Sequence, residues 1–172
     1  MRLVLCIVLF ACSCALGFVA ADRLRQRCKA IEALQGILDT LSVRLRYYQE
    51  PLSQAVQRTA QSTEGNAREF LSMLAQQLGK GYSAAEALKG ALTEKTQAIT
   101  FQESLGKEEK QSLEELFERI GSHREDQEAA FALCAQRLTQ QMADAQQEWQ
   151  KKGRLYRMMG ALGGAIWLIL FL

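Results

Sequence analysis

Two uncharged, strongly apolar segments stand at the ends of the chain. The first covers residues 3–21 and the second covers residues 158–172. A helix of about 20 apolar residues crosses a bilayer, so the first segment is long enough to span. The second is roughly 22 Å long at helical rise, which is enough for a thinned bilayer. The pattern predicts membrane helices at residues 1–21 and 158–172, around a helical domain at residues 22–157.

Heptad patterns adjoin both apolar segments. After the first, apolar residues recur every seven positions in two interleaved series: Leu24, Ile31, Leu38 and Leu45, and Leu34, Leu41 and Tyr48, which Leu52 follows four residues later. Before the second, the stripe is Phe131, Ala135, Leu138, Met142, Ala145 and Trp149. Such spacing indicates helices that pack along one face. We expect long helices at about 23–48 and 125–156, which pair as an antiparallel stalk. The alternative is that both stripes face the shorter helices instead.

Four shorter helices are predicted between the long ones, at about 51–61, 67–78, 84–96 and 108–120. Pro51 suits the first turn of a helix and disfavours helix just before it. Ser83 with Glu86 three residues later forms a capping-box pattern. Residues 101–107, which include Gly106, are expected to be a looser connection. The predicted fold is all-α, a six-helix bundle with a long stalk.

Basic residues flank both apolar segments on their inner sides. They are Arg23, Arg25 and Arg27 after the first, and Lys151, Lys152, Arg154 and Arg157 before the second. Lys and Arg beside a membrane helix remain in the cytoplasm. We therefore expect a cytoplasmic domain with both termini outside, in contact with membrane lipid.

The first segment also allows two other readings. The sequence Val19-Ala20-Ala21 before Asp22 is compatible with a signal-peptidase site, and residues 9–12, which end at Cys12, loosely resemble a lipoprotein cleavage box. Either would make the chain an exported or lipid-anchored helical protein. The basic cluster that follows resists translocation, which favours a retained anchor.

Small residues recur four apart within both apolar segments. They are Ser13, Gly17 and Ala21 in the first, and Gly160 and Gly164 in the second. This spacing lets helix backbones approach closely in lipid, and it also arises as background because Gly and Ala are common in membrane helices.

Catalytic and cofactor chemistry finds no support in the residue pattern. The five cysteines form no CxxC pair, and His123 is the only histidine. Gly106-Lys107 lacks the first glycine of a phosphate-binding loop. The net charge of +2 gives no reason to expect nucleic acid. We expect no enzyme activity, no cofactor and no metal. The acidic stretch at 108–128 is either a solvated face or a docking surface for a basic partner.

Several sequence pieces resemble the stage III sporulation protein AB family along the whole chain. They are EPLSQAVQRTA, GKGYSAAEALKGAL and the final KKGRLYRMMGALGGAIWLILFL. The middle piece also resembles a turn of the inner-membrane platform proteins of type II secretion and type IV pili. That turn is matched here by Gly81, Ser83, Glu86, Ala87 and Leu88. Platform proteins carry two such helical domains, whereas this chain has one, and a homo-oligomer would restore the second.

The resemblance implies a membrane adaptor in endospore formation, located in the mother-cell membrane around the forespore. Its implied partners are a secretion-type ATPase and other membrane subunits of a secretion-like channel. We expect the ATPase to contact the end of the stalk away from the membrane, at Tyr48, Glu50, Glu125 and Asp126. The alternative function is a self-assembling structural membrane protein, in which the heptads pair between subunits.

Overall fold

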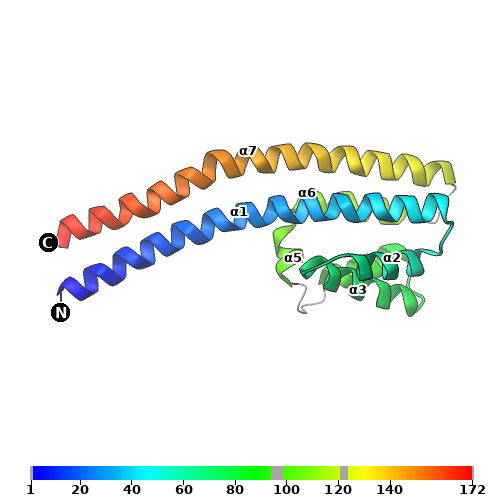
Figure 1. Cartoon of the computed structure of the whole chain (residues 1–172), viewed down its shortest axis with the longest axis horizontal. Helices are drawn as coiled ribbons and strands as arrows, with labels where there is room; N and C mark the ends of the chain where they lie inside the picture. The colour runs from blue at the N-terminus through cyan, green and yellow to red at the C-terminus, as the bar shows by residue number, and fades with distance from the viewer. Residues whose placement is uncertain (1, 94–98, 121–123, 172) are drawn as a thin grey trace. The chain divides into compact units, whose positions relative to one another are not determined.

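The chain is all-helical over the residues that the computed structural model describes, which are 2–93, 99–120 and 124–171 (Figure 1). Within these ranges, side chains are described except at 2–11, 13, 14, 99, 100, 124, 125, 154, 157 and 160–171. This part of the chain holds seven helices and no strand, which confirms the all-α prediction.

Two helices are much longer than the others. α1 spans Arg2–Tyr47 and α7 spans Arg124–Phe171. Each joins one apolar end to its heptad stripe without interruption. α1 ends just before Gln49, whose φ of 52° lies in the left-handed region, and Pro51 then precedes the next helix. The predicted helix end before the proline is confirmed.

The chain divides into two compact units, which are described separately. Unit 1 comprises Met1–Cys28 and Ala143–Leu172, and unit 2 comprises Lys29–Met142. The shorter helices all belong to unit 2. They are α2 (Leu52–Ser62), α3 (Asn66–Gly79), α4 (Ala84–Thr93), α5 (Ile99–Ser104) and α6 (Lys107–Arg119).

The heptad stripes supply much of the core of unit 2. Ile31, Leu34, Leu38 and Leu41 of α1 are at most 3% exposed, and Leu138 of α7 is fully buried. Burial of a leucine or isoleucine side chain stabilises a fold by about 1.5–3 kcal/mol. The stripe of α1 loses this burial at its end, where Tyr48 is exposed.

Within unit 2, α1 and α7 touch each other and run antiparallel. Gln35 Nε2 donates to Thr139 Oγ1 at 3.5 Å, and Arg46 Nε lies 3.0 Å from Glu128 Oε1. From Gln35 to Arg46 the chain advances eleven residues, and from Glu128 to Thr139 it also advances eleven. Equal separations in opposite directions define a straight antiparallel pairing, so the two stripes do not merely face the shorter helices.

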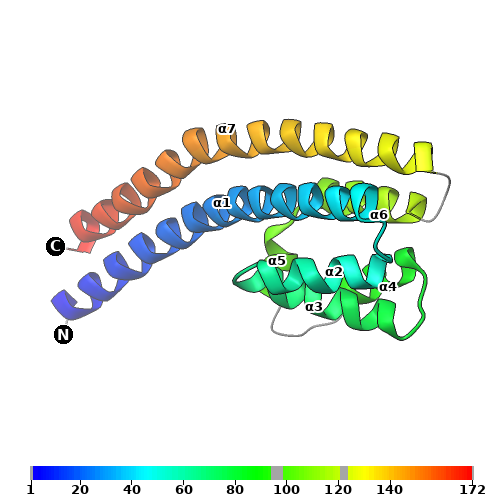
Figure 2. The ribbon, with the colours of Figure 1, turned by 45° about the vertical axis from the view of Figure 1, so that its right-hand side comes forward.

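The shorter helices pack around α3. α3 contacts α2, α4 and α5, and α4 also contacts α6; Figure 2 shows α2, α3 and α4 gathered together. Their apolar residues meet in the middle, with Val56, Leu71 and Leu88 at most 1% exposed.

The structure differs from the sequence prediction between α4 and α6. Residues 101–107 were expected to be an irregular connection, but α5 occupies Ile99–Ser104, so the described residues hold seven helices rather than six. The reason is burial: Phe101 and Leu105 are 5% and 3% exposed, and the ring of Phe101 lies 5.5 Å from that of Phe70. Gln102 Nε2 also donates to the carbonyl of Ala91, which ties α5 to α4.

Candidate functional site: a partner-binding pocket

The ends of several helices of unit 2 meet around one open pocket. Its volume is about 570 Å³. It is lined by Leu45, Gln49, Glu50, Leu52, Ser53, Leu78, Tyr82, Ala84, Ile120 and Gln127. These residues come from the end of α1, the start of α2, the α3–α4 turn, the end of α6 and the start of α7. The pocket thus brings together Glu50 and the Gly81–Ser83 turn, which the sequence singled out for separate reasons.

Exposed tyrosines mark this region of unit 2. Tyr47 and Tyr48 are 71% and 70% exposed, and Tyr82, which lines the pocket, is 53% exposed. The guanidinium of Arg46 lies 5.6 Å from the ring centre of Tyr47. Exposed tyrosines are enriched at protein interfaces. Tyr48 was predicted from the sequence as a contact residue, whereas Tyr82 was not, because its only signal was its place in a helix-breaking turn.

Glu50 joins the end of α1 to α2. Its carboxylate lies 2.6 Å from Arg58 Nη1 and 3.7 Å from Arg44 Nη1, and its side chain is only 12% exposed. The backbone N–H of Glu50 also donates to the Arg44 carbonyl at 3.5 Å. Glu50 therefore has an internal role in holding the pocket wall, and its predicted contact with a partner stays a prediction.

The acidic pair predicted beside the pocket is described in part. Asp126 is exposed on the first turns of α7. The side chain of Glu125 lies outside the described residues, as does His123. Among the side chains that are described, Asp126 forms no ion pair, so its charge is available to a partner.

The five platform-motif residues build one turn and the helix that follows it. Gly81 has a φ of +90°, a conformation that only glycine adopts without strain. Ser83 Oγ donates to Glu86 Oε2 at 2.7 Å, and Glu86 N–H donates back to Ser83 Oγ at 3.3 Å. The predicted capping box is confirmed. The Ser83 hydroxyl and the Ser83 backbone N–H, which donates to Glu86 Oε2 at 3.1 Å, hold the pKa of Glu86 below its usual value. Ala87 and Leu88 are at most 1% exposed, so the motif serves the fold and positions Tyr82.

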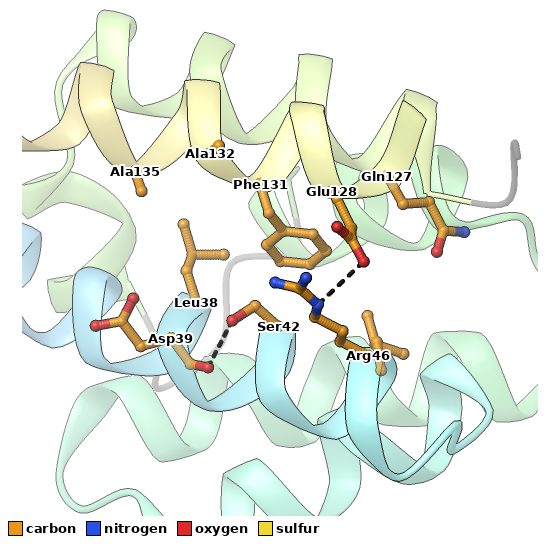
Figure 3. Close-up of a pocket in the computed structure, with 10 residues that line it drawn as sticks. Leu38, Asp39, Ser42, Arg46, Gln127, Glu128, Phe131, Ala132 and Ala135 are labelled. Atoms are coloured by element: carbon orange, nitrogen blue, oxygen red, sulfur yellow. Dashed lines mark hydrogen bonds and ion pairs between the residues drawn. The ribbon is translucent and has the colours of Figure 1, made fainter. Parts of the chain in front are cut away.

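A second, narrower groove lies between α1 and α7 in unit 2 (Figure 3). Its volume is about 220 Å³. Leu38 and Phe131 form its apolar floor, and the Arg46–Glu128 ion pair crosses one end. Because both charged side chains are about half exposed, solvent weakens this pair and it contributes little stability.

In unit 1, the basic residues of α1 and α7 lie side by side. Arg27 Nη1 and Lys152 Nζ both reach Glu148, at 3.3 Å and 2.7 Å. The hydrogen bond from Lys152 lowers the pKa of Glu148, and the same bond raises the pKa of Lys152. Arg23, Arg25 and Lys151 are exposed, while the side chains of Arg154 and Arg157 lie outside the described residues. The clusters predicted from opposite ends of the sequence therefore meet.

The predicted membrane segments are described only in part. Ala21 is 6% exposed and Gly17 is half-buried, whereas the side chains of Ser13, Gly160 and Gly164 are outside the described residues. Among the residues whose side chains the structure describes, no helix is long and apolar enough to cross a membrane. The same residues contain no group of three metal-ligating side chains.

The comparisons with known proteins agree with each other. The family model described as stage III sporulation protein AB matches residues 2–172. A Bacillus subtilis (strain 168) protein named stage III sporulation protein AB is 27% identical over 157 residues, which cover 91% of this chain and 90% of the relative. No solved structure matches the chain.

Proposed function

The chain belongs to the stage III sporulation protein AB family, and we propose that it is a non-enzymatic membrane adaptor of a sporulation complex. In this role it couples a cytoplasmic ATPase of the secretion type to membrane subunits of a transenvelope channel during endospore formation. Residues 1–21 and 158–172 are its anchors in the mother-cell membrane, residues 22–157 are its cytoplasmic domain, and both termini lie outside.

The Arg27–Glu148–Lys152 cluster is the observation that carries the proposal. It places the basic flanks of α1 and α7 beside each other, so the two apolar segments begin within about one helical turn of each other. Large apolar side chains next to these flanks are uncovered: Phe18 and Met158 are 65% and 56% exposed. Lipid would cover such side chains, and the basic residues would face anionic headgroups.

The continuity of α1 and α7 supports a coupling role. Each helix passes from unit 2 into unit 1 without a loop. A helix holds its backbone through regular hydrogen bonds, whereas a flexible linker loses any displacement applied at one end. The pocket lined by Gln49 and Tyr82 is the surface that we assign to the ATPase.

Protease protection in sealed inside-out vesicles tests the topology. Trypsin added from the cytoplasmic side should cleave exposed sites in residues 22–157, such as Arg68 and Lys80. Full protection of that region would place it outside the cytoplasm, and the exported-protein alternative would replace the adaptor.

Charge reversal on α7 tests the ATPase surface. Asp126→Lys beside the pocket should weaken binding of the secretion-type ATPase to the full-length chain by about fivefold, the effect of one exposed charge pair. Asp144→Lys is the matched control, because Asp144 is also exposed on α7 and lies eighteen residues, or about five turns, further along. Equal binding by the two variants would remove this pocket as the ATPase surface.

A second candidate function is self-assembly through α1 and α7. It is favoured by Val43 and Leu133, which are apolar yet 45% and 40% exposed on these helices in unit 2. Sedimentation of the full-length chain in detergent should then show a mass that rises with concentration, and Val43→Ser should lower it.

A further inference from the structure

A small pocket lies between α1 and α7 in unit 1. Its volume is about 90 Å³, and it is lined by Phe18, Ala21, Asp22, Arg25 and Trp149. A single buried water needs about 10–15 Å³ of such volume, so the pocket admits a larger polar group. Its lining combines two aromatic side chains with two opposite charges, and it joins Trp149, the last residue of the α7 heptad stripe, to Arg25 of the basic flank.

Within the described residues, the two charges in this pocket have no oppositely charged partner. Asp22 Oδ2 accepts a hydrogen bond from Gln26 Nε2 at 2.8 Å, but no charged side chain in the described part of the chain pairs with Asp22 or with Arg25. Nearby Arg27 differs, because it pairs with Glu148. The pocket therefore offers one carboxylate and one guanidinium, three residues apart on α1.

The position of the Trp149 ring at the edge of the pocket depends on Gly153, which follows it one helical turn later. A Cβ on residue 153 would lie 3.2 Å from Trp149 Cδ1, closer than side-chain carbons normally approach. Gly153 thus lets the indole lie against α7, where Trp149 remains 37% exposed. The ring faces the pocket and also retains access to its surroundings.

The pocket also lies at the depth of a phospholipid headgroup under the proposed topology. The Arg27–Glu148 contact puts Trp149 level with Gln26, five residues from Ala21, where the apolar segment ends. Five residues of helix span about 7 Å, and the headgroup layer on each side of a bilayer is about 5–8 Å thick. Tryptophan is enriched at this depth in membrane proteins.

We propose that Asp22, Arg25 and Trp149 form a binding site for the zwitterionic headgroup of phosphatidylethanolamine. The Arg25 guanidinium holds the phosphate through charge-assisted hydrogen bonds. The primary ammonium donates to the Asp22 carboxylate and lies over the indole of Trp149, where a cation–π contact adds to the attraction. The site rests on the membrane position proposed above.

The same chemistry distinguishes this lipid from others. A choline headgroup has no N–H and cannot donate to Asp22, so phosphatidylcholine keeps the phosphate contact and the cation–π contact with Trp149 but loses the hydrogen bond to Asp22. An anionic headgroup without an amine leaves the Asp22 carboxylate unmatched and close to negative charge. The pocket therefore selects for a headgroup that carries both a phosphate and a primary amine.

The test uses the fluorescence of Trp149 in the full-length chain. The chain has two tryptophans, so Trp167→Phe leaves Trp149 as the only one. This variant is placed in phosphatidylcholine nanodiscs that contain lipids with a nitroxide near the headgroup end of one acyl chain. The label is carried either by phosphatidylethanolamine or by phosphatidylcholine, and quenching by each gives their relative binding beside Trp149.

We expect phosphatidylethanolamine to be favoured by about twofold to fivefold, the effect of one exposed charge-assisted hydrogen bond from its ammonium to Asp22. Asp22→Asn should bring the ratio to about one, and Arg25→Gln should lower quenching by both lipids. Arg23→Gln, an exposed neighbour outside the pocket, should preserve both the ratio and the quenching. Equal loss with Arg23→Gln would reveal diffuse charge attraction and overturn the site. Equal quenching by both lipids when the site is unsubstituted would overturn the binding site but would leave the proposed membrane position of Trp149 standing. No quenching by either would overturn both.

Discussion

Glu50 and Arg58 form an ion pair of 2.6 Å that fixes α2 against the end of α1. Gln49 directly precedes Glu50, and its left-handed φ of 52° costs energy for a residue other than glycine. Strain of this kind persists only where neighbouring contacts enforce it, and Glu50 supplies such contacts through Arg44 and Arg58.

Substitution of Glu50 should therefore destabilise the protein. Glu50→Gln removes the charge that Arg44 and Arg58 share, and we expect a loss of about 1–2 kcal/mol in the free energy of unfolding, as for hydrogen bonds to charged groups. Thermal unfolding of the full-length chain in detergent, followed by circular dichroism, measures it. Glu64→Gln is the control, since Glu64 is exposed in the α2–α3 loop and its change should stay within about 0.5 kcal/mol.

The α3–α4 turn should tolerate alanine at one glycine and not at the other. Gly81→Ala forces a side chain into a φ of +90° and should cost about 1–2 kcal/mol. Gly79→Ala places the same methyl group in the last residue of α3, where nothing lies within 4 Å, and should be neutral or stabilising. Similar melting temperatures for the two variants would contradict the role of Gly81.

The capping box should lose its contribution to the stability of the folded protein in acid. Ser83→Ala removes the cap of α4 and should cost about 1 kcal/mol near neutral pH. Because Ser83 lowers the pKa of Glu86 below 4.5, the contribution of this carboxylate is present above that value and disappears as the pH falls through the lowered pKa. Melting curves from pH 7 to pH 3 should show the gap between wild type and Ser83→Ala narrowing; a gap that widened in acid would reverse this assignment.

The buried thiol of Cys134 should be inert in the folded protein. Burial raises its pKa to about 11, and its Sγ lies 3.6 Å from the Ser112 carbonyl. Because the folded pKa is raised, the stabilising effect of burying the neutral thiol is complete below the unfolded pKa of about 9.0 and is lost as the pH rises through the folded value. Mass spectrometry after brief maleimide treatment at pH 7.5 should find Cys134 unmodified in the folded chain and modified once the chain is unfolded in guanidinium.

Sequence patterns predicted the parts of the fold that depend on residues close together in the chain. The heptads of α1 and α7, the proline before α2 and the Ser83–Glu86 box all act locally, and the structure places each as expected. α5 was missed because its helical state depends on Phe101 packing against Phe70, a contact thirty-one residues apart in sequence.

The candidate site was predicted less completely for the same reason. Tyr48 and Asp126 are exposed, as a partner contact requires, but the inward ion pairs of Glu50 follow from how α1 meets α2. The association of Tyr82 with Gln49, or of Trp149 with Asp22, depends on which helices lie together. No spacing within a single helix records that arrangement.

The equal eleven-residue intervals between Gln35 and Arg46 and between Glu128 and Thr139 limit how this protein can change length. Deletion of one residue inside either interval turns the remainder of that helix by about 100° and moves its apolar stripe off the facing helix. Removal of seven residues from both helices restores the stripe, because the heptad returns to phase. When the chain is lengthened or shortened within residues 35–46, the fold should therefore be kept only if residues 128–139 change by the same multiple of seven.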